Sequence, residues 1–407
     1  MLRLALVWGC WALIGWQATV AAIGEVFAAS ARKPLAAAID PLGGGSGAAW
    51  AVARLTAGDM PAASAAATQV LRITPINQQA LTVLALAGPA DRASGLMTVA
   101  ALLGWRTPLA QLWLAQAGLV AHQPDLFATR TDAFARSAPD PAPVFALVDQ
   151  AIHQPAMRAA TAQRLALFPD WRGAYLARFD NSDPNAAADR TALLDTLAAS
   201  HAGPTRPELL VYVGQLEHFG READARAAWT RFAARPELWA GRLYDGGFTR
   251  VGDSSTTFPF EWTTRDSPGG SAWIEPAGGK PGLLVHNDGS AAGSLVVQLL
   301  ALAPGHYRLV TDAAPEAGSG AIAMPGGDGA GAAAFRWSIT CAGGGTSLAD
   351  SLAAAALDVH AGPASYAFTV PPGCASQSIA LTGVPGLTGN ATDMRIRSAR
   401  IDPATQR

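Results

Sequence analysis

The spacing of apolar residues changes once along this chain, near Gly241. Across residues 48–241 apolar residues recur every three or four positions, and short breaks with proline or glycine separate the segments, as in amphipathic helices. Across residues 242–407 short runs such as Phe335–Cys341 alternate apolar and polar residues, as strands with one buried face require. The sequence therefore predicts a multidomain α plus β protein, in which a helical domain is followed by a β-sandwich.

A long uncharged apolar segment, Leu4–Gly24, precedes the helical region. As a helix, about 20 residues would span roughly 30 Å, which is enough to cross the hydrocarbon layer of a membrane. We expect residues 1–33 to be an uncleaved transmembrane helix that anchors the protein, followed by a glycine-containing flexible linker at 34–47. The alternative is a signal peptide, cleaved among the small residues near Ala28–Ala31.

The cysteines bear on the compartment in which the protein works. Cys10 lies in the apolar segment, whereas Cys341 and Cys374 both fall in the predicted β domain. We predict that Cys341 and Cys374 form a disulfide, which suits an oxidising periplasm; two free buried thiols in a cytosolic domain are the alternative. Few lysines and abundant alanine and glycine indicate a GC-rich bacterial genome. We therefore expect a single-pass protein of a bacterial inner membrane, with its bulk in the periplasm.

Two stretches of the helical region resemble the tetratricopeptide repeat. In each, a glycine marks the turn between two helices, a small alanine follows five residues later, and a proline closes the second helix. The residues are Gly58, Ala63 and Pro75 in one stretch and Gly220, Ala225 and Pro236 in the other. The segment between them keeps a helical composition but loses this phase. The resemblance implies an α-solenoid-like scaffold that contacts an envelope protein partner.

Three sequence stretches of the β domain resemble jelly-roll domains of the carbohydrate-binding-module and galactose-binding-like group. They are YDGGFTR at 244–250, FPFEW at 258–262 and QLLALAPGHYRL at 298–309. These motifs encode the fold and carry no ligand chemistry. The whole arrangement also resembles membrane-anchored repeat proteins associated with exopolysaccharide assembly, which implies a polysaccharide as a further partner.

Catalytic and metal-binding signatures are missing from the sequence. The seven histidines are scattered without the spacing of a metal pair, and no serine or cysteine stands in a nucleophile motif. Asp180 and Asp183 begin an acidic loop that lacks the glycine and the closing acid of a calcium loop, so we expect a helix-capping loop there. We expect no cofactor and no metal. The formal net charge of −2 argues against a nucleic-acid partner.

The candidate ligand-contacting residues are aromatic. Trp262 and Trp273 fall in the irregular first part of the β domain, where each is either a core residue or an exposed ring that stacks on a sugar. Glu261 is a candidate carboxylate for glycosidase chemistry, but its partner carboxylate cannot be named. The sequence therefore predicts a non-catalytic, membrane-anchored periplasmic scaffold that supports polysaccharide assembly or export. The alternative is a glycan-modifying enzyme with an accessory sandwich.

Overall fold

The computed structural model describes residues 16, 19, 22, 23, 44–105, 107–252, 255–265, 267–275, 281–316, 334–342, 348, 358–385 and 391–404. Its contacts divide the chain into two compact units. Unit 1 contains residues up to Tyr175 and Ala192–Ala202, and unit 2 contains Leu176–Thr191 and the chain from Gly203 onward. The predicted anchor Leu4–Gly24 lies almost entirely outside the described residues. Within the described part, no helix is both long enough and apolar enough to cross a membrane.

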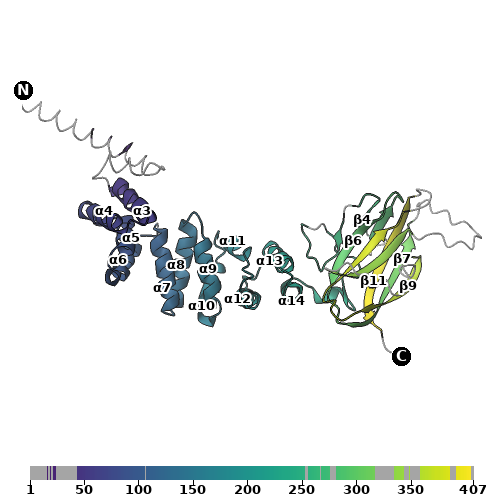
Figure 1. Cartoon of the computed structure of the whole chain (residues 1–407). Coiled ribbons are helices and arrows are strands. Elements are labelled where there is room, and N and C mark those ends of the chain that lie inside the picture. The colour runs from purple at the N-terminus through teal and green to yellow at the C-terminus, as the bar shows by residue number, and fades with distance from the viewer. Residues whose placement is uncertain are drawn as a thin grey trace, which may run out of the picture. The chain divides into compact units, whose positions relative to one another are not determined.

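Unit 1 is built from helices that pack in consecutive pairs, α3 on α4, α5 on α6 and α7 on α8 (Figure 1). The helices up to the end of this region are α3 (Gly44–Thr56), α4 (Met60–Ile73), α5 (Gln78–Ala87), α6 (Ala90–Leu102), α7 (Pro108–Val120), α8 (Pro124–Ser137), α9 (Ala142–Ala151), α10 (Pro155–Leu165), α11 (Arg172–Leu176) and α12 (Ala186–Ala199). The prediction of a helical N-terminal half is confirmed.

Alanine allows these helices to lie close together. The core between α3, α4 and α5 is made mostly of alanine, including Ala51, Ala63 and Ala67. α3 begins at Gly44, so the last residues of the predicted linker are helical. A methyl group on Gly47 would come within 2.7 Å of Val70 on α4, which shows why a glycine stands at this point of the helix.

The predicted turns of the two repeat-like stretches are confirmed. Gly58 and Gly220 both adopt positive φ angles, of 77° and 70°, a conformation that glycine reaches without a steric penalty. After the first turn, the Asp59 side chain accepts a hydrogen bond from the Ala62 N–H at 3.1 Å and so caps α4. Ala63 is fully buried in the hairpin core, as the small residue of a close helix pair should be.

Unit 2 joins a final helix pair to the β domain. Its further elements are α13 (Arg206–His218), α14 (Glu222–Phe232), the 3₁₀ turn η1 (Pro236–Leu238), β1 (Trp239–Ala240), β2 (Leu243–Tyr244), β3 (Thr263–Thr264), β4 (Gly270–Ile274), β5 (Leu283–Asn287), β6 (Gly293–Leu300), β7 (Gly305–Pro315), β8 (Phe335–Cys341), β9 (Gly362–Val370), β10 (Gln377–Gly383) and β11 (Thr392–Pro403). The change from helix to strand therefore falls between Phe232 and Trp239, while α13 and α14 group with the β domain by packing.

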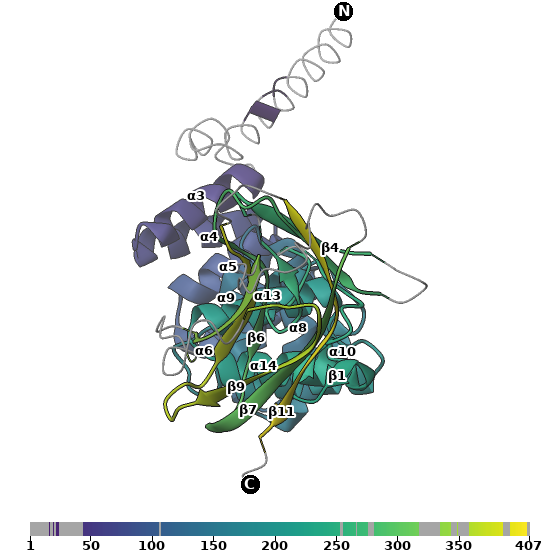
Figure 2. The same cartoon turned by 90° about the vertical axis from the view of Figure 1, so that its right-hand side faces the viewer.

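The β domain consists of two antiparallel sheets that share one hydrophobic core. The four-stranded sheet has the order β3-β6-β10-β8, and the five-stranded sheet has the order β4-β5-β11-β7-β9. β7 and β11 run side by side in the larger sheet (Figure 2). From β5 to β11, every successive strand belongs to the opposite sheet. The prediction of a β-rich C-terminal half is confirmed.

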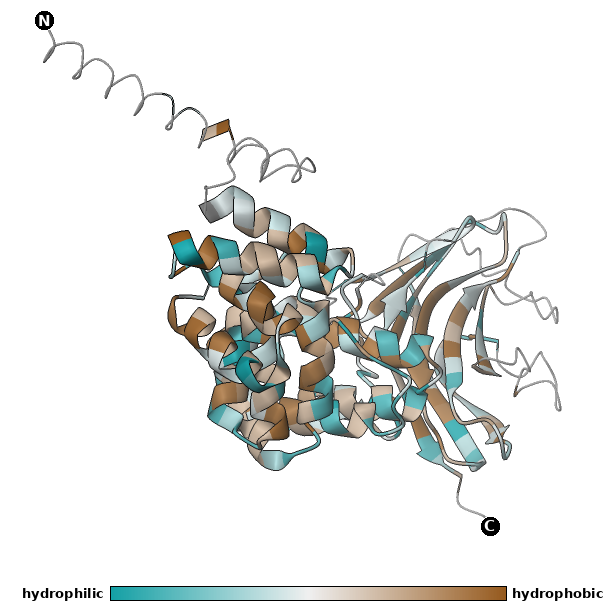
Figure 3. Cartoon of the chain, turned by 60° about the vertical axis from the view of Figure 1, so that its left-hand side comes forward, coloured by the Kyte–Doolittle hydropathy of each residue, from teal (hydrophilic) through white to brown (hydrophobic). Residues whose placement is uncertain are grey.

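The predicted inward faces of the strands are also confirmed. Phe335, Trp337 and Ile339 on β8 have no exposed surface, and the residues between them are partly exposed. Apolar and polar bands alternate along the strands in Figure 3. Residues 295–300 of β6 are apolar on both faces of the strand, apart from Gln298, and β6 has a neighbouring strand on each side. Period-two alternation thus identifies the core positions of the regular strands.

The motif at 244–250 shapes the start of the β domain. Asp245 is buried with a positive φ of 49°. Its carboxylate accepts hydrogen bonds from the Thr249 N–H, the Thr249 hydroxyl and the Arg250 N–H at 2.8–2.9 Å. Burial nevertheless raises the pKa of Asp245, against the effect of these hydrogen bonds. Phe248 packs in the core with its ring centroid 5.2 Å from that of Trp262. The motif therefore encodes a turn and a core contact.

Candidate functional site

Trp273 is an exposed aromatic residue on β4, one of the two edge strands of the five-stranded sheet. Its neighbour Ala272 packs on the sandwich core, so strand alternation directs Ser271 and Trp273 to the outer face. Trp273 keeps 42% of its surface exposed. Of the two alternatives predicted for this residue, the exposed position is the one observed.

Strand register places Trp273 in line with a charged residue. Trp273 pairs with Leu284 on β5, and Leu284 pairs with Arg395 on β11. Because neighbouring strands lie about 4.8 Å apart, the backbones of Trp273 and Arg395 are roughly 10 Å apart across the sheet. The next row on the same face is Ser271, His286 and Asp393. These two rows on the outer side of β4, β5 and β11 are here named the Trp273 face.

Two carboxylates and a carbonyl hold the Arg395 side chain in place. Its Nε donates to Glu316 Oε2 at 3.0 Å, and its Nη1 donates to the Glu275 carbonyl at 2.7 Å. Its Nη2 lies 3.4 Å from Glu275 Oε2. The hydrogen bond with Glu316, more than any other contact, raises the pKa of Arg395 above its ordinary value. The guanidinium is therefore a fixed cation and not a mobile surface group.

The second row contains a hydrogen-bonded histidine and aspartate. His286 Nδ1 lies 2.6 Å from Asp393 Oδ1, and both side chains are about one-third exposed. An exposed tryptophan ring offers an apolar platform, while His286 and Asp393 in the next row offer partly exposed polar groups. A flat apolar ring beside oriented polar groups is chemically suited to the apolar face and the hydroxyl groups of a sugar.

Trp262 occupies the core, the other alternative predicted for it. It has no exposed surface, and its indole N–H donates to the Asp245 carbonyl at 3.1 Å. Its ring centroid lies 6.1 Å from that of Trp337. A ring enclosed in this way cannot stack on a sugar, so its packing corrects the assignment of Trp262 as a carbohydrate-binding residue.

The acidic residues named in the sequence analysis form hydrogen bonds that stabilise the structure around them. The Ser182 N–H donates to Asp180 at 2.9 Å, and the Asn185 N–H donates to Asp183 at 2.8 Å, just before α12. Glu261 is buried, and both its carboxylate oxygens bind the Arg206 guanidinium, at 2.5 and 3.3 Å. Asp180 and Asp183 thus each accept a hydrogen bond from the backbone two residues later, in the loop before α12, and Glu261 links α13 to the β domain.

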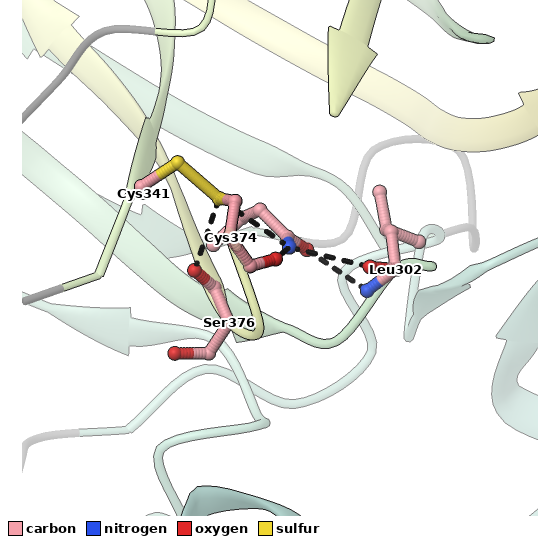
Figure 4. Close-up of a disulfide and its surroundings, with 5 residues drawn as sticks. Leu302, Cys341, Cys374 and Ser376 are labelled. Atoms are coloured by element: carbon pink, nitrogen blue, oxygen red, sulfur yellow. Dashed lines mark hydrogen bonds between the residues drawn. A yellow bond between two sulfur atoms is a disulfide. The ribbon is translucent and has the colours of Figure 1, made fainter. Parts of the chain in front are cut away.

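The predicted disulfide between Cys341 and Cys374 is confirmed (Figure 4). It joins the end of β8 to the turn before β10, with a Cα–Cα distance of 5.5 Å, within the usual range for a disulfide. The buried Gln377 side chain supports the turn, because its Nε2 donates to the Cys374 carbonyl at 2.7 Å and its Oε1 accepts from the Leu302 N–H at 2.8 Å.

Unit 1 carries a separate groove of about 680 Å³ between α3, α5 and α7. Of the described residues that line it, none carries a charge. Its polar members are amides and threonines, and its apolar members include side chains at the start of α7. The lining includes Val52, Asn77, Gln78, Gln79, Thr82 and Leu109. The groove is a neutral surface of mixed polarity, and sequence periodicity did not predict it.

The comparisons with known proteins leave the family open. No family model matches this sequence, and no curated protein matches it. One solved structure that is similar to part of the chain is described as "Functional Characterization of Pseudomonas Aeruginosa pilF". The match covers 54% of this chain and 92% of that one, with 14% sequence identity and a TM-score of 0.27. A TM-score this low carries no structural or functional argument.

Sequence reasoning missed most of the Trp273 face. His286 and Asp393 are 107 residues apart, and neither stands in a recognisable motif. Arg395 alternates with apolar neighbours, which predicts only that it lies on the polar side of a final strand. The register between β5 and β11 brings these residues together, and register is a property of the fold that no local spacing reports.

Proposed function

We propose that this chain is a non-catalytic scaffold of the bacterial envelope whose β-sandwich binds a polysaccharide on the Trp273 face. The observation that carries the proposal is Trp273 itself, an exposed ring on an edge strand in line with the fixed cation Arg395. Among the described strands, β4 has a neighbour on one side only, and an edge position of this kind suits a ligand that runs past Trp273. A rigid aromatic ring also contributes contact area at a small cost in conformational entropy.

The strand order supports a jelly roll, the finer fold implied by the sequence resemblance. A jelly roll sends successive strands to alternate sheets, and the connections from β5 to β11 follow this rule. Fold alone does not assign a ligand. The proposal that the ligand is a polysaccharide therefore depends on the Trp273 face and not on the jelly-roll fold.

The disulfide supports a periplasmic location. Disulfides persist in oxidising compartments and are rare in the bacterial cytosol, so a bond between Cys341 and Cys374 fits the export of the β domain. The apolar segment Leu4–Gly24 would then be the anchor that keeps the protein at the inner membrane. Retention of an N-terminal peptide in the mature protein, read by mass spectrometry, tests this anchor against a cleaved signal peptide.

The groove of unit 1 supports contact with an envelope protein partner. Its lining carries no charge among the described residues, and burial of an unpaired charge is costly. The matching partner is therefore an uncharged polypeptide segment. The enzymatic alternative has less support, because Glu261, its candidate carboxylate, is committed to Arg206.

Sugar binding is tested with the full chain in detergent on a glycan array, followed by affinity measurements on the glycans that bind. Trp273→Ala should weaken binding by at least about tenfold, since truncation of an exposed aromatic anchor removes its contact area. Trp105→Ala is the matched control, because Trp105 is also exposed, at 55%, but lies in unit 1. The proposal fails if no glycan binds, or if the two variants bind equally well.

A further inference from the structure

A small cavity lies between α13 and the outer face of the four-stranded sheet, within unit 2. Its volume is about 260 Å³. The sheet side is set by register, because Thr263 pairs with Val297 and Ser378 pairs with Leu299, so these four side chains share one face. The helix side contributes Glu217. The cavity thus has an apolar floor, hydroxyl groups, one carboxylate and, from Arg265, one guanidinium.

Glu217 has an unsatisfied oxygen at this cavity. Its Oε1 is buried and has no hydrogen-bond partner among the described residues. Burial, aided by the nearby charge of Glu222, raises the pKa of Glu217 to about 7 from an ordinary value of 4.5. A buried acceptor without a donor is costly, so the carboxylate would gain from a donor supplied by a ligand.

The charged groups around α13 leave Glu217 without an obvious counter-ion. Arg206 is bound to Glu261, and Arg221 is bound to Asp224. Arg265 lines the same cavity but is exposed, and its charge is not among the causes that shift the pKa of Glu217. Among the residues that the structure describes, no cation is therefore paired with Glu217, and the ammonium group of a ligand could take that place.

Size and ligand chemistry favour an organic cation over a metal ion. A calcium ion takes about six to eight oxygen ligands, whereas the described lining offers Glu217 as its carboxylate. At roughly 30 Å³ for each water molecule, the cavity holds far more than one ion. The residues Thr257, Thr263 and Ser378 also line it. The hydroxyls of Thr257 and Thr263 lie 3.2 Å apart and hydrogen-bond each other, and a hydroxyl oxygen in such a pair can still accept a hydrogen bond from a ligand.

We propose that this cavity binds a small hydroxylated molecule through its primary ammonium group, with the ammonium at Glu217 and the hydroxyls at Thr257, Thr263 and Ser378. An amino sugar and an ethanolamine headgroup both carry this chemistry. The proposal is independent of the Trp273 face, because that face lies on the other sheet.

The test compares serinol with glycerol on the full chain, by ligand-observed NMR titration at about pH 8, where Glu217 is mostly ionised. The two probes differ by one group, ammonium in place of hydroxyl. Serinol should bind about tenfold more tightly, because a hydrogen bond to a charged group is stronger than a neutral one. Glu217→Gln should remove this preference, and so should a shift to about pH 5.5, where Glu217 is protonated.

Equal binding of the two probes, no binding of serinol, or a preference that survives in Glu217→Gln would overturn the proposal. Circular dichroism of Glu217→Gln checks that the variant is folded. Glucosamine and phosphoethanolamine then compete against bound serinol. Displacement by glucosamine assigns an amino sugar, displacement by phosphoethanolamine assigns a headgroup, and displacement by neither overturns the ligand class.

Discussion

In the first helix pairs the buried side chains are mostly alanine, whereas in the β-sandwich they are tryptophan, phenylalanine, tyrosine and branched aliphatic residues. Alanine contributes little apolar area, so those helices gain stability by lying close together over many small contacts. The sandwich sheets are held further apart, and large rings fill the space between them. The helical core should therefore be sensitive to added atoms, and the sandwich core to removed ones.

The largest expected effect is in the sandwich. Trp337→Ala should lower the free energy of unfolding by about 3–5 kcal/mol, because it leaves a cavity where a fully buried ring stood. Urea unfolding followed by near-ultraviolet circular dichroism measures this loss. Trp273→Ala is the control within the same domain and should change stability by less than about 1 kcal/mol, since Trp273 is partly exposed. Similar losses in both variants would contradict the assignment of Trp337 to the core.

The disulfide is expected to have the next largest effect, and it has no counterpart among the described residues of unit 1. Replacing Cys341 and Cys374 together by alanine should cost roughly 3–4 kcal/mol in the chain-entropy model for a separation of 33 residues. Thermal melts with and without a reducing agent measure it. Reduction should lower the melting temperature of the wild type and leave that of the double variant unchanged. If the reducing agent does not change the melting temperature of the wild type, the disulfide is not formed.

A single added methyl group should distinguish the two kinds of core. A Cβ on Gly118 of α7 would lie 2.9 Å from the Phe127 backbone nitrogen on α8. Gly118→Ala should therefore destabilise unit 1 by about 1–3 kcal/mol. Gly95→Ala is the matched control, because its new Cβ meets nothing within 4 Å on α6, and it should stabilise the helix by about 0.5–1 kcal/mol. Chemical denaturation of the two variants should give shifts of opposite sign.

The smallest expected effect depends on pH. The folded pKa of Glu217 is raised to about 7, above its ordinary 4.5, so the folded state binds the proton more tightly than the unfolded chain does. This contribution to stability is complete below about pH 4.5 and is lost as the pH rises through about 7. Glu217→Gln cannot ionise and should melt a few degrees above the wild type at about pH 8. The difference in melting temperature between the two proteins should be smaller at about pH 5. A difference that does not change with pH would show that the ionisation of Glu217 is not its cause.

The sequence allowed the architecture to be predicted because each element carries a local signal. Gly58 and Gly220 mark turns, the run from Phe335 alternates on one strand, and Cys341 and Cys374 fall where two neighbouring strands bring them together. These features depend on residues close in the chain, or on a pairing with few alternatives.

The candidate sites were harder to predict because tertiary contacts create them. Trp262 and Trp273 both fall in the irregular first part of the β domain, yet one is in the core and the other on an edge strand. Glu217 is an ordinary polar residue on a helix until α13 lies against the sheet that carries Thr263 and Ser378. Neither burial in an irregular segment nor a cavity between distant elements leaves a periodic pattern in the sequence.

The position of β11 has a consequence for how the chain folds as it is synthesised. β11 is the last strand of the sandwich in sequence, yet it lies between β5 and β7 and contributes Ile396, Ala399 and Ile401 to the core. Each helix pair of unit 1 is contiguous and can close as it leaves the ribosome, whereas the larger sheet lacks an inner strand until β11 emerges. The larger sheet therefore stays incomplete until the last strand has been synthesised.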